Sequence, residues 1–353
     1  MTQTTPNLAE INKAQLVPLR AAMYDFSEAG VRAALAAISS PDAIFHACHP
    51  FGDLQGANAF YDGLYAPLFA AVPDLERRDY IVAAGPTAEG ANWVGCAGFY
   101  TGRFVAPWLD IPPTGHLMHM RFHEFYRFED GQLVEVQCLW DLPEVMMQAN
   151  VWPLSPSLGR EWLVPGPATQ DGLRTGAYDA KTSAASCDLV LQALTFMKKY
   201  PSQGGPEVMD MPQFWHPNLN WYGPAGIGSA RGIQAFRDWH QIPFIAAMPD
   251  RGLYPTEISA HFFADGPYVA VTGWPNMAQT LSHSGWLGIA PPNTKITLCS
   301  LDFWRVEAGK IRENWVLVDL MDLYQQIGVD ALSRMREFNK SRSGFDPDTG
   351  RAL

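Results

Sequence analysis

One stretch of this sequence occurs twice. Residues 125–148, FYRFEDGQLVEVQCLWDLPEVMMQ, align without a gap to residues 303–326, FWRVEAGKIRENWVLVDLMDLYQQ, at a shift of 178 (303 − 125). Extended back to Trp108 and Trp286, the alignment covers 41 positions, of which 13 are identical. Unrelated sequences of average composition would share roughly two or three. A period this long is too large for a solenoid unit, so it indicates a duplicated domain.

A second match lies upstream, where residues 56–74 align to residues 232–250 at a shift of 176 with 9 identities in 19 positions. The chain of 353 residues is long enough for two hydrophobic cores.

Residues 149–183 between the copies are rich in Pro and Gly but also contain Trp152 and Trp162, so we expect them to pack across both domains, over a pocket mouth. The predicted organisation is a first domain at 1–150, a packed linker at 151–184, a second domain at 185–336 and an exposed polar tail at 337–353.

Each copy has the pattern of helices first, then strands, then a closing helix. In the first copy, residues 1–15 are expected to be loose, and residues 15–38 and 58–71 to be helical. Strands are predicted at 80–83, 91–100, 116–128 and 133–139, the last two joined by a turn at Asp130-Gly131. This order predicts an α+β fold with helices on one face of an antiparallel sheet.

Composition excludes several classes of partner. The net charge of −11, with no local cluster of Lys and Arg, argues against nucleic-acid binding. The apolar run Leu189–Phe196 is far too short for a membrane span, and the N-terminal residues have no signal-peptide pattern. Five widely spaced cysteines without a Cys-x-x-Cys pair predict reduced thiols and a cytoplasmic location.

The pattern of a helical start, Gly-x-x-Ala-Phe, Pro-Asp and four strands resembles the SnoaL-like polyketide cyclases of the nuclear transport factor 2-like superfamily. Its strongest part is the segment 303–315, FWRVEAGKIRENW, and the likeness covers roughly residues 20–150 and 187–336. The resemblance implies two tandem cones, each with N-terminal helices on a strongly curved antiparallel sheet around a pocket. It also implies that the two cones pair through their sheets as an intramolecular pseudo-dimer, with further homo-oligomerisation left open.

The sequence departs from that family at the acid/base positions of the last strand. SnoaL-type cyclases carry Glu-His-Trp-Asp there, in which the Asp is the general acid/base and the His supports it. The His position is Val136 in the first copy and Asn314 in the second, and the Asp position is Cys138 and Val316. Neither copy can perform the family's proton transfer with these residues.

Another carboxylate could replace the missing one. Side chains alternate along a strand, so Ser300, Asp302 and Trp304 share one face. A carboxylic acid in an apolar cone has its pKa raised by desolvation, as a general base near neutral pH requires. We therefore predict Asp302 as the catalytic base, with Asn314 as its hydrogen-bond partner or as an oxyanion donor. The alternative is that Asp302 forms an ion pair with Arg305 or an exposed lysine.

A histidine supplements this pair in the prediction. His283 precedes the Trp286 loop and could reach into the cone as an acid/base or as a substrate-orienting donor, or could be an exposed turn residue. Four further side chains of the second copy are predicted to bind substrate, although the first two could instead anchor a helix to the sheet: Tyr222, His240, Trp274 and Trp304.

The first copy has its own polar set. Glu124 aligns with Asp302 (302 − 178), which suggests a duplicated pocket. The predicted substrate-binding residues of this copy are His46, Tyr100, Glu124 and Trp140. The segment His46-Ala47-Cys48-His49 contains ligand types, but no distant partner pair identifies a zinc site, so we predict no metal and no cofactor.

Two pairs of acidic residues recur between the copies. Asp141 and Asp319 precede the closing helices and are expected to be N-caps. Glu135 and Glu313 are expected to form structural ion pairs with the recurring arginines Arg127 and Arg305.

These features predict a protein that binds a small molecule. The first hypothesis is a cofactor-independent enzyme performing acid/base chemistry beside a carbonyl, such as an aldol-type cyclisation, an isomerisation or a dehydration. The second is a catalytically inert small-molecule-binding protein of the same fold, which the missing family His and Asp favour.

Overall fold

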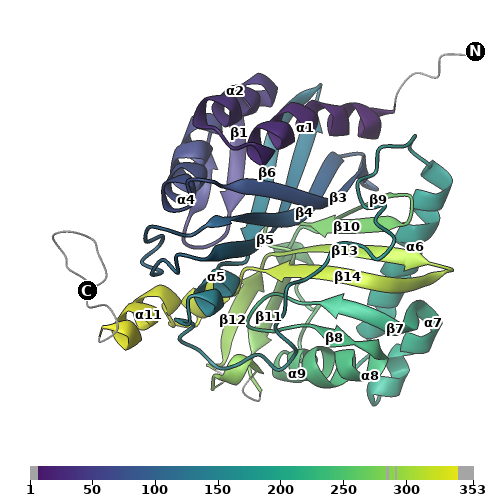
Figure 1. Cartoon of the computed structure of the whole chain (residues 1–353). Coiled ribbons are helices and arrows are strands. Elements are labelled where there is room, and N and C mark those ends of the chain that lie inside the picture. The colour runs from purple at the N-terminus through teal and green to yellow at the C-terminus, as the bar shows by residue number, and fades with distance from the viewer. Residues whose placement is uncertain (1–6, 284–285, 291, 341–353) are drawn as a thin grey trace, which may run out of the picture.

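The computed structural model describes residues 7–283, 286–290 and 292–340. Two sheets, each with helices on one side, lie one above the other (Figure 1). The fold is therefore α+β with two similar halves. The predicted tail falls largely on residues 341–353 and the first residues of the chain on 1–6, and both lie outside the described residues.

The first half is built around a sheet in the order β2-β1-β6-β5-β4-β3. Its strands are β1 (Ser39–Ala47), β2 (Gly52–Gln55), β3 (Glu76–Pro86), β4 (Asn92–Arg103), β5 (Leu117–Glu129) and β6 (Gln132–Trp140). Its helices are α1 (Leu8–Tyr24), α2 (Glu28–Ile38), α3 (Ala57–Phe60), α4 (Ala66–Ala71) and α5 (Leu142–Gln148), with a π-helical turn at Tyr61–Tyr65.

The second half repeats this order as β8-β7-β14-β13-β10-β9. Its strands are β7 (Trp215–Tyr222), β8 (Ala230–Arg231), β9 (His261–Asp265), β10 (Tyr268–Thr272), β13 (Ser300–Glu307) and β14 (Lys310–Val318), and a separate hairpin is formed by β11 (Met277–Leu281) and β12 (Thr294–Leu298). Its helices are α6 (Ala180–Met197), α7 (Met211–Phe214), α8 (Gly232–Phe236), α9 (Ile242–Ala247), α10 (Leu320–Gln326) and α11 (Ala331–Asn339). A π-helical turn at Arg237–Gln241 is the counterpart of Tyr61–Tyr65, and short 3₁₀ turns lie at Pro206–Met209, Pro255–Glu257 and Trp286–Gly288.

Two details differ from the sequence prediction. The expected loose start and single helix at 15–38 are wrong, because α1 begins at Leu8 with Asn7 as its N-cap and Ser27 caps a separate α2. The sheets are also not wholly antiparallel, since β1 pairs with β6, and β7 with β14, in parallel. The predicted hairpin turn is confirmed: Asp130 and Gly131 both have positive φ, as do Ala308 and Gly309 in the second half.

Equivalent residues of the two halves meet where the sheets contact each other. The rings of Phe125 and Phe303, which are 178 positions apart, lie 5.0 Å apart between centroids. The imidazole Nδ1 of His123 lies 2.5 Å from the carbonyl oxygen of its counterpart Leu301. Contact between equivalent positions indicates a local twofold relation between the copies. Gly95 fits beside this contact because a Cβ there would lie 2.9 Å from the Phe303 ring.

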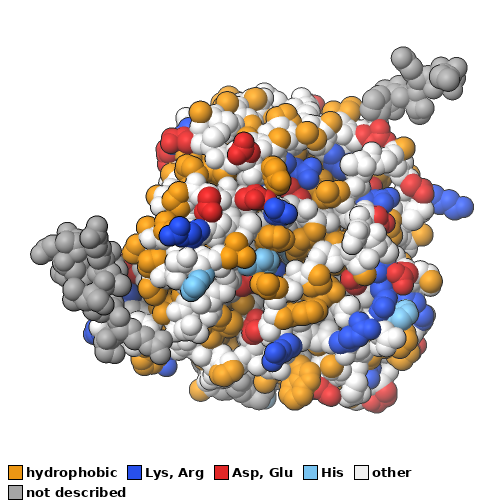
Figure 2. All heavy atoms as spheres, viewed as in Figure 1, with side chains coloured by type: hydrophobic (Ala, Val, Ile, Leu, Met, Phe, Trp, Pro, Cys, Tyr) orange, Lys and Arg blue, Asp and Glu red, His pale blue; other side chains and the backbone are white. Residues whose placement is uncertain are grey.

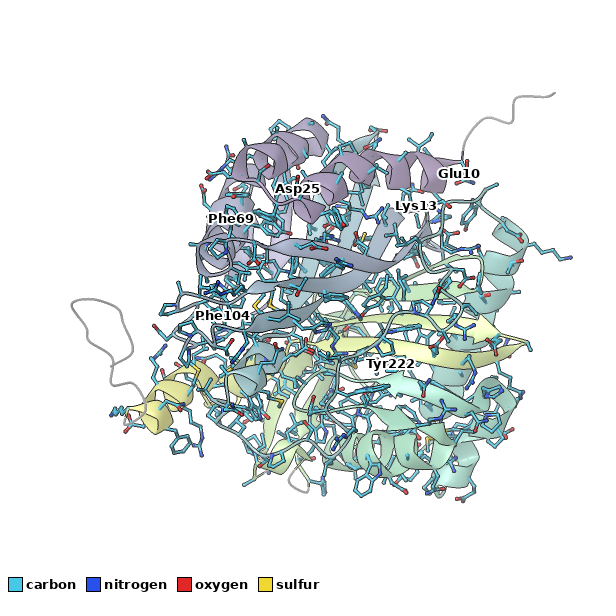
Figure 3. The ribbon with its side chains drawn as sticks, viewed as in Figure 1. Glu10, Lys13, Asp25, Phe69, Phe104 and Tyr222 are labelled. Carbon is cyan, nitrogen blue, oxygen red and sulfur yellow. The ribbon has the colours of Figure 1, made fainter. Side chains whose placement is uncertain are left out.

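The segment between the halves, residues 149–179, runs across both sheets (Figure 1). Its Pro165 carbonyl accepts a hydrogen bond of 2.9 Å from Trp315 Nε1 of the second half, and Leu173 forms a bridge to Val82 of the first. From the first half, Lys13 on α1 also reaches across to Asp265 of β9, with 2.5 Å between Nζ and Oδ2 (Figure 3). Acidic and basic side chains are both spread over this face of the molecule (Figure 2).

Candidate functional site

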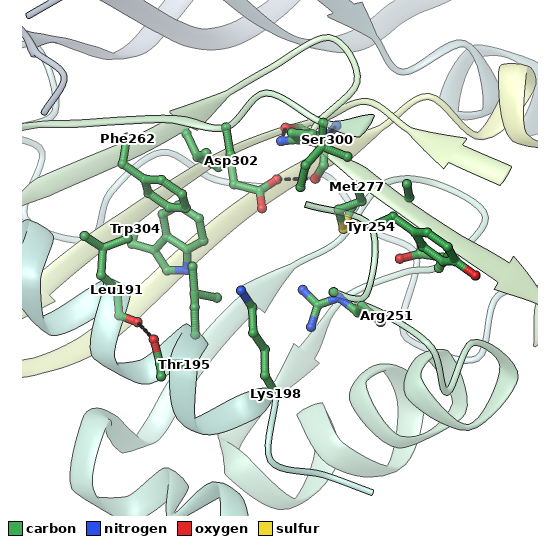
Figure 4. Close-up of a pocket in the computed structure, with 18 residues that line it drawn as sticks. Leu191, Thr195, Lys198, Arg251, Tyr254, Phe262, Met277, Ser300, Asp302 and Trp304 are labelled. Carbon is green, nitrogen blue, oxygen red and sulfur yellow. Dashed lines mark hydrogen bonds between the residues drawn. The ribbon is translucent and has the colours of Figure 1, made fainter. Parts of the chain in front are cut away.

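A cavity of about 200 Å³ opens in the second half. It lies between helix α6, the loop after α9, the β11–β12 hairpin and the sheet (Figure 4). A smaller compartment of about 80 Å³ shares Asp302, Trp304 and Arg251 with it, so the two adjoin. No residue of the connecting segment 149–179 lines either space. This differs from the expectation that the segment covers the mouth of a pocket.

Strand alternation on β13 places its polar residues in this cavity. Ser300, Asp302 and Trp304 line it, whereas Leu301 and Phe303 point the other way and pack in the core shared with the first half. Residue 302 pairs with Val316 of β14 and Val271 of β10, both central strands of the sheet. A rigid scaffold therefore holds the carboxylate.

The Asp302 carboxyl group is suited to exchange a proton near neutral pH. Burial raises its pKa from the ordinary 3.8 to about 7, and the Ser300 hydroxyl and the Arg251 charge only partly oppose this rise. The Ser300 hydroxyl donates a hydrogen bond of 2.7 Å to Oδ1 (Figure 4). Asp302 forms no ion pair with Arg305, which instead binds Glu313 and Glu307.

Arg251 enters the same cavity from the loop after α9. The preceding Asp250 fixes this loop, because its carboxylate oxygens accept from the Thr280 backbone N–H at 2.8 and 3.1 Å. Burial lowers the pKa of the Arg251 guanidinium, and the nearby Asp302 charge opposes that decrease. Its buried Nε has no hydrogen-bond partner, and its guanidinium carbon lies 5.5 Å from the ring centroid of Phe244.

The smaller compartment contains His240 and Asn314. The His240 ring stacks on Trp221 at 3.9 Å between centroids, and its buried Nδ1 has no partner. Burial lowers the pKa of His240 to about 3, so this imidazole is neutral at physiological pH. The Asn314 amide donates to the Phe303 carbonyl at 2.9 Å, which uses one of its two N–H groups.

Three of the residues predicted for the second-half pocket lie elsewhere. His283 is exposed and lines neither space; its imidazole is hydrogen-bonded to Ser282, and its backbone N–H donates to the Ala247 carbonyl. Tyr222 lies on the face of its strand that packs toward the first half, with its hydroxyl bonded to Glu313 at 3.2 Å (Figure 3). Trp274 packs against the core of the first half. Ser284 and Gly285, next to His283, lie outside the described residues.

Three of the four candidates of the first half, Tyr100, Glu124 and Trp140, come together in a buried cluster. Glu124 is fully buried and accepts hydrogen bonds of 3.0 Å from both Tyr100 and Trp140. It also forms a buried ion pair with Arg77. His46 lies apart from this cluster, because it stacks on Trp274 of the other half at 5.8 Å. The first half therefore has a saturated polar cluster where the second has a cavity.

Side-chain volume explains this difference. At the shift of 178, the buried Phe122 and Trp140 of the first half become Ser300 and Val318 in the second. The adjoining strands are also shorter, because β9 and β10 have 5 residues each where β3 and β4 have 11 and 12. Smaller side chains and a truncated sheet leave the interior of the second half open.

Several cavity residues were not anticipated from the sequence, and three of them carry a charge or an amide unpartnered within the described residues: Arg251, Gln279 and Lys198. The repeat contains a signal for the first, because Arg251 follows Pro249-Asp250 where the apolar Leu75 follows Pro73-Asp74. Gln279 lies on the β11–β12 hairpin and Lys198 at the end of α6, which fall outside the aligned segments.

The recurring acidic residues connect the halves reciprocally. Asp319 accepts from Asp322 N–H at 3.0 Å as an N-cap and from His49 N–H of the first half at 2.8 Å. Asp141 makes no side-chain cap and accepts from Ala225 N–H of the second half at 3.0 Å and from Arg121 at 2.6 Å. The cap prediction is thus confirmed for Asp319 and wrong for Asp141, whose Oδ2 instead accepts from Arg121 and Ala225.

The ion pairs of Glu135 with Arg127 and of Glu313 with Arg305 are confirmed, at 2.7 and 2.5 Å. Within the described residues, no group of three or more His, Cys, Asp or Glu is arranged to hold a metal ion. None of the described helices is both long and apolar enough to cross a membrane.

Comparison with known proteins places this geometry in a family. The SnoaL-like polyketide cyclase family matches residues 18–149 and again residues 193–327. The chain therefore belongs to the SnoaL-like polyketide cyclase family, in two tandem copies. A search of curated proteins gave no match.

Solved structures of this fold each match about the extent of one copy. A protein from Jannaschia sp. CCS1 described as a SnoaL-like polyketide cyclase is 23% identical, with a TM-score of 0.35, over 41% of this chain and 95% of its own. A SnoaL-like polyketide cyclase from Agrobacterium tumefaciens is 20% identical, with a TM-score of 0.30, over 39% and 96%. A nuclear transport factor 2-like protein from Burkholderia pseudomallei is 13% identical, with a TM-score of 0.31, over 39% and 95%.

Proposed function

We propose that the second half is a cofactor-independent enzyme that acts on a small carbonyl compound, with Asp302 as its general acid/base. The observation that carries this proposal is the Asp302 carboxyl, which lines a cavity and has a pKa of about 7. A group with a pKa near the working pH is both available as a base and able to return the proton.

The reaction begins when the Asp302 carboxylate removes a proton from the carbon beside the carbonyl. The electron pair of the broken C–H bond moves to the carbonyl oxygen and produces an enolate. Gln279 and the second N–H of Asn314 are neutral donors available to that oxygen. Protonated Asp302 then returns the proton to another carbon in an isomerisation, or to the oxygen formed or expelled in an aldol-type cyclisation or a dehydration.

The first half has a structural role in this proposal. Its carboxylate at the equivalent position, Glu124, is already bonded to Tyr100, Trp140 and Arg77. A base with all its lone pairs engaged and no access to a substrate cannot take a proton from carbon.

The experiment begins with a thermal-shift screen of small β-diketones, β-keto esters and hydroxyketones against the full chain. Each hit is then incubated in D₂O, where NMR follows the exchange of protons beside the carbonyl, and its turnover is measured. We expect Asp302→Asn to retain binding and to slow exchange by about 10²- to 10⁴-fold. Asp238→Asn, at an exposed carboxylate of the same half, is the matched control and should have no effect.

The outcomes separate the two candidate functions. Hits that bind but show neither exchange nor turnover with the wild type would establish an inert binding protein, which the Asn314 and Val316 replacements favour as the second candidate. Exchange that persists in Asp302→Asn would show that another group is the base.

A further inference from the structure

The cavity contains an arginine, Arg251, that forms no ion pair with any described carboxylate. The buried arginines near the centre of the molecule are paired: Arg77 with Glu124, Arg121 with Asp141 and Arg305 with Glu313. Arg251, by contrast, has no ion-pair or hydrogen-bond partner among the described residues. The Arg251 side chain is only partly exposed and its Nε is buried, so a ligand that brings an acceptor would complete a charge-assisted hydrogen bond there.

A second, independent feature points into the same space. Gln279 is 0% exposed, and neither its amide nitrogen nor its amide oxygen has a hydrogen-bond partner within the described part of the chain. Buried amides are nearly always satisfied, so an unsatisfied one that lines a cavity is placed to bind a ligand. The amide offers two donors and one acceptor, which suits a neutral carbonyl or hydroxyl group.

The remaining lining defines the rest of the ligand. Trp304, Phe262, Ile258 and Met277 supply an apolar and aromatic surface. Among the lining residues, Asp302 is the one acidic side chain, and Lys198 adds a second positive charge from the end of α6 (Figure 4). The cavity thus has an excess of positive charge beside an apolar wall.

We propose that the ligand is a small carboxylate with an apolar or aromatic body, whose carboxylate pairs with Arg251 and whose neutral polar group bonds Gln279. This inference names the substrate class of the proposed active site. It rests on the proposed function only in stating which end of the ligand reacts. A guanidinium fork matches the two oxygens of a carboxylate. A phosphate dianion fits less well, because the charged residues of the described lining are Arg251, Lys198 and Asp302, which leave a net charge of +1 when Asp302 is ionised.

The experiment compares matched pairs of probes by isothermal titration calorimetry with the full chain. The probes are phenylacetate, 3-phenylpropanoate and 4-phenylbutanoate, each against its own primary amide, and phenethyl phosphate. We expect the best carboxylate to bind about 10- to 100-fold more tightly than its amide, as a charge-assisted pair requires. Arg251→Gln should abolish that difference, and Arg251→Lys should retain part of it.

Two variants serve as controls. Arg231→Gln changes an exposed arginine of the same half, outside the cavity, and should leave the preference unchanged. Asp302→Asn should keep the preference or strengthen it, because it removes the one negative charge of the lining. The wild-type comparison of acid with amide requires no variant, so a poorly folded Arg251→Gln would not prevent the test.

Several results would overturn this inference: amides that bind as well as acids, a preference that survives Arg251→Gln, tighter binding of the phosphate, or no carboxylate binding at millimolar concentration. Carboxylates that bind through Arg251 without proton exchange would support the inference and refute only the enzymatic proposal. Proton exchange in neutral diketones, together with no preference for carboxylates over amides, would support the enzymatic proposal and refute this inference.

Discussion

The two halves carry a carboxylate at the same place on the same strand, and only one of these faces a cavity. Glu124 is surrounded by Tyr65, Tyr100, Tyr126 and Trp140, whereas Asp302 faces a space bordered by Trp304 and Arg251. The duplication thus preserved the sheet and the acid, while the surrounding volume changed. The comparison teaches that the volume around a carboxylate decides what it can contact: both oxygens of Glu124 are engaged by the protein, whereas Asp302 accepts from Ser300 and otherwise borders open space.

A single substitution tests whether the close packing of side chains inside the first half stabilises the protein. Trp140→Val introduces the residue found at the equivalent position 318, removes the Trp140–Glu124 hydrogen bond and leaves a cavity. We expect the free energy of unfolding to fall by about 4 kcal/mol, measured by urea denaturation.

The reverse exchange, Val318→Trp, is the matched control. Val318 lines the smaller compartment of the second half, so the larger ring should fill that space and abolish ligand binding. Its cost in stability should stay below that of Trp140→Val. Equal losses from the two variants would contradict the view that only the first half is closely packed.

Removing the negative charge of Glu124 or of Asp302 compares the two halves at their equivalent carboxylates. Glu124→Gln leaves the fully buried Arg77 with Asp79 as its remaining partner, at 2.9 Å. We expect a loss of about 3 kcal/mol, the lower end of the range for breaking a buried pair. Urea denaturation of Glu124→Gln, measured together with Asp302→Asn, tests this expectation. A Glu124→Gln variant as stable as the wild type would show that the ion pair of Glu124 with Arg77 does not stabilise the protein.

Asp302→Asn should instead stabilise the protein, and only above acidic pH. The folded-state pKa of about 7 lies above the ordinary 3.8, so the folded protein retains a proton that the unfolded chain releases. The wild type therefore loses stability as the pH rises from about 4 to about 7, and the variant lacks this decrease. This pKa difference corresponds to about 4 kcal/mol. Because the Asp302 side chain is partly exposed, we expect solvent to reduce the effect to about half, with the two proteins equally stable near pH 4 and the variant more stable by about 2 kcal/mol at pH 8.

Urea unfolding of both proteins over this range measures the effect. The charged groups that line the cavity with Asp302 are Arg251 and Lys198, His240 in the smaller compartment is neutral over this range, and all three are the same in both proteins. A difference in stability that did not change with pH would mean that Asp302 titrates as an exposed carboxyl does.

Much of the fold could be predicted from the sequence, because it depends on patterns that the duplication repeats. The shift of 178 located the hairpin Phe125–Gln148 twice, and its Asp130-Gly131 turn has the positive φ angles that such a turn requires. The alternation along β13 placed Ser300, Asp302 and Trp304 on the face that lines the cavity. Periodicity of this kind is local, so one sequence is enough to detect it.

The rest of the site depends on contacts between distant segments. Gln279 and Lys198 belong to elements that have no aligned counterpart, and His283 was assigned from its proximity in sequence to Trp286 alone. Whether a conserved carboxylate lies in a cavity is decided by volumes such as those of Phe122 and Ser300. The repeat does contain a signal for Arg251, because a charged residue stands there where the first copy has the apolar Leu75, but such a difference does not indicate which segments border the residue in space.

The smallest effect is expected where the halves exchange hydrogen bonds, at Asp141 and Asp319. Asp319 accepts two backbone N–H groups and pairs with no arginine, and burial raises its pKa to about 7. An asparagine has a single acceptor oxygen, so Asp319→Asn keeps one of these two bonds and removes a buried charge, and it should change the free energy of unfolding by about 1 kcal/mol. Asp141→Asn is the paired measurement in the same urea series and should cost more, because it removes the ion-pair partner at 2.6 Å from the buried Arg121. If Asp319→Asn proved as damaging as Asp141→Asn, the contact between the halves would depend on the charge at both positions. A small cost for Asp319→Asn together with a larger cost for Asp141→Asn would show that the two copies meet through the same geometry. The contact would then depend on a neutral acceptor at residue 319 and on an ion pair at residue 141.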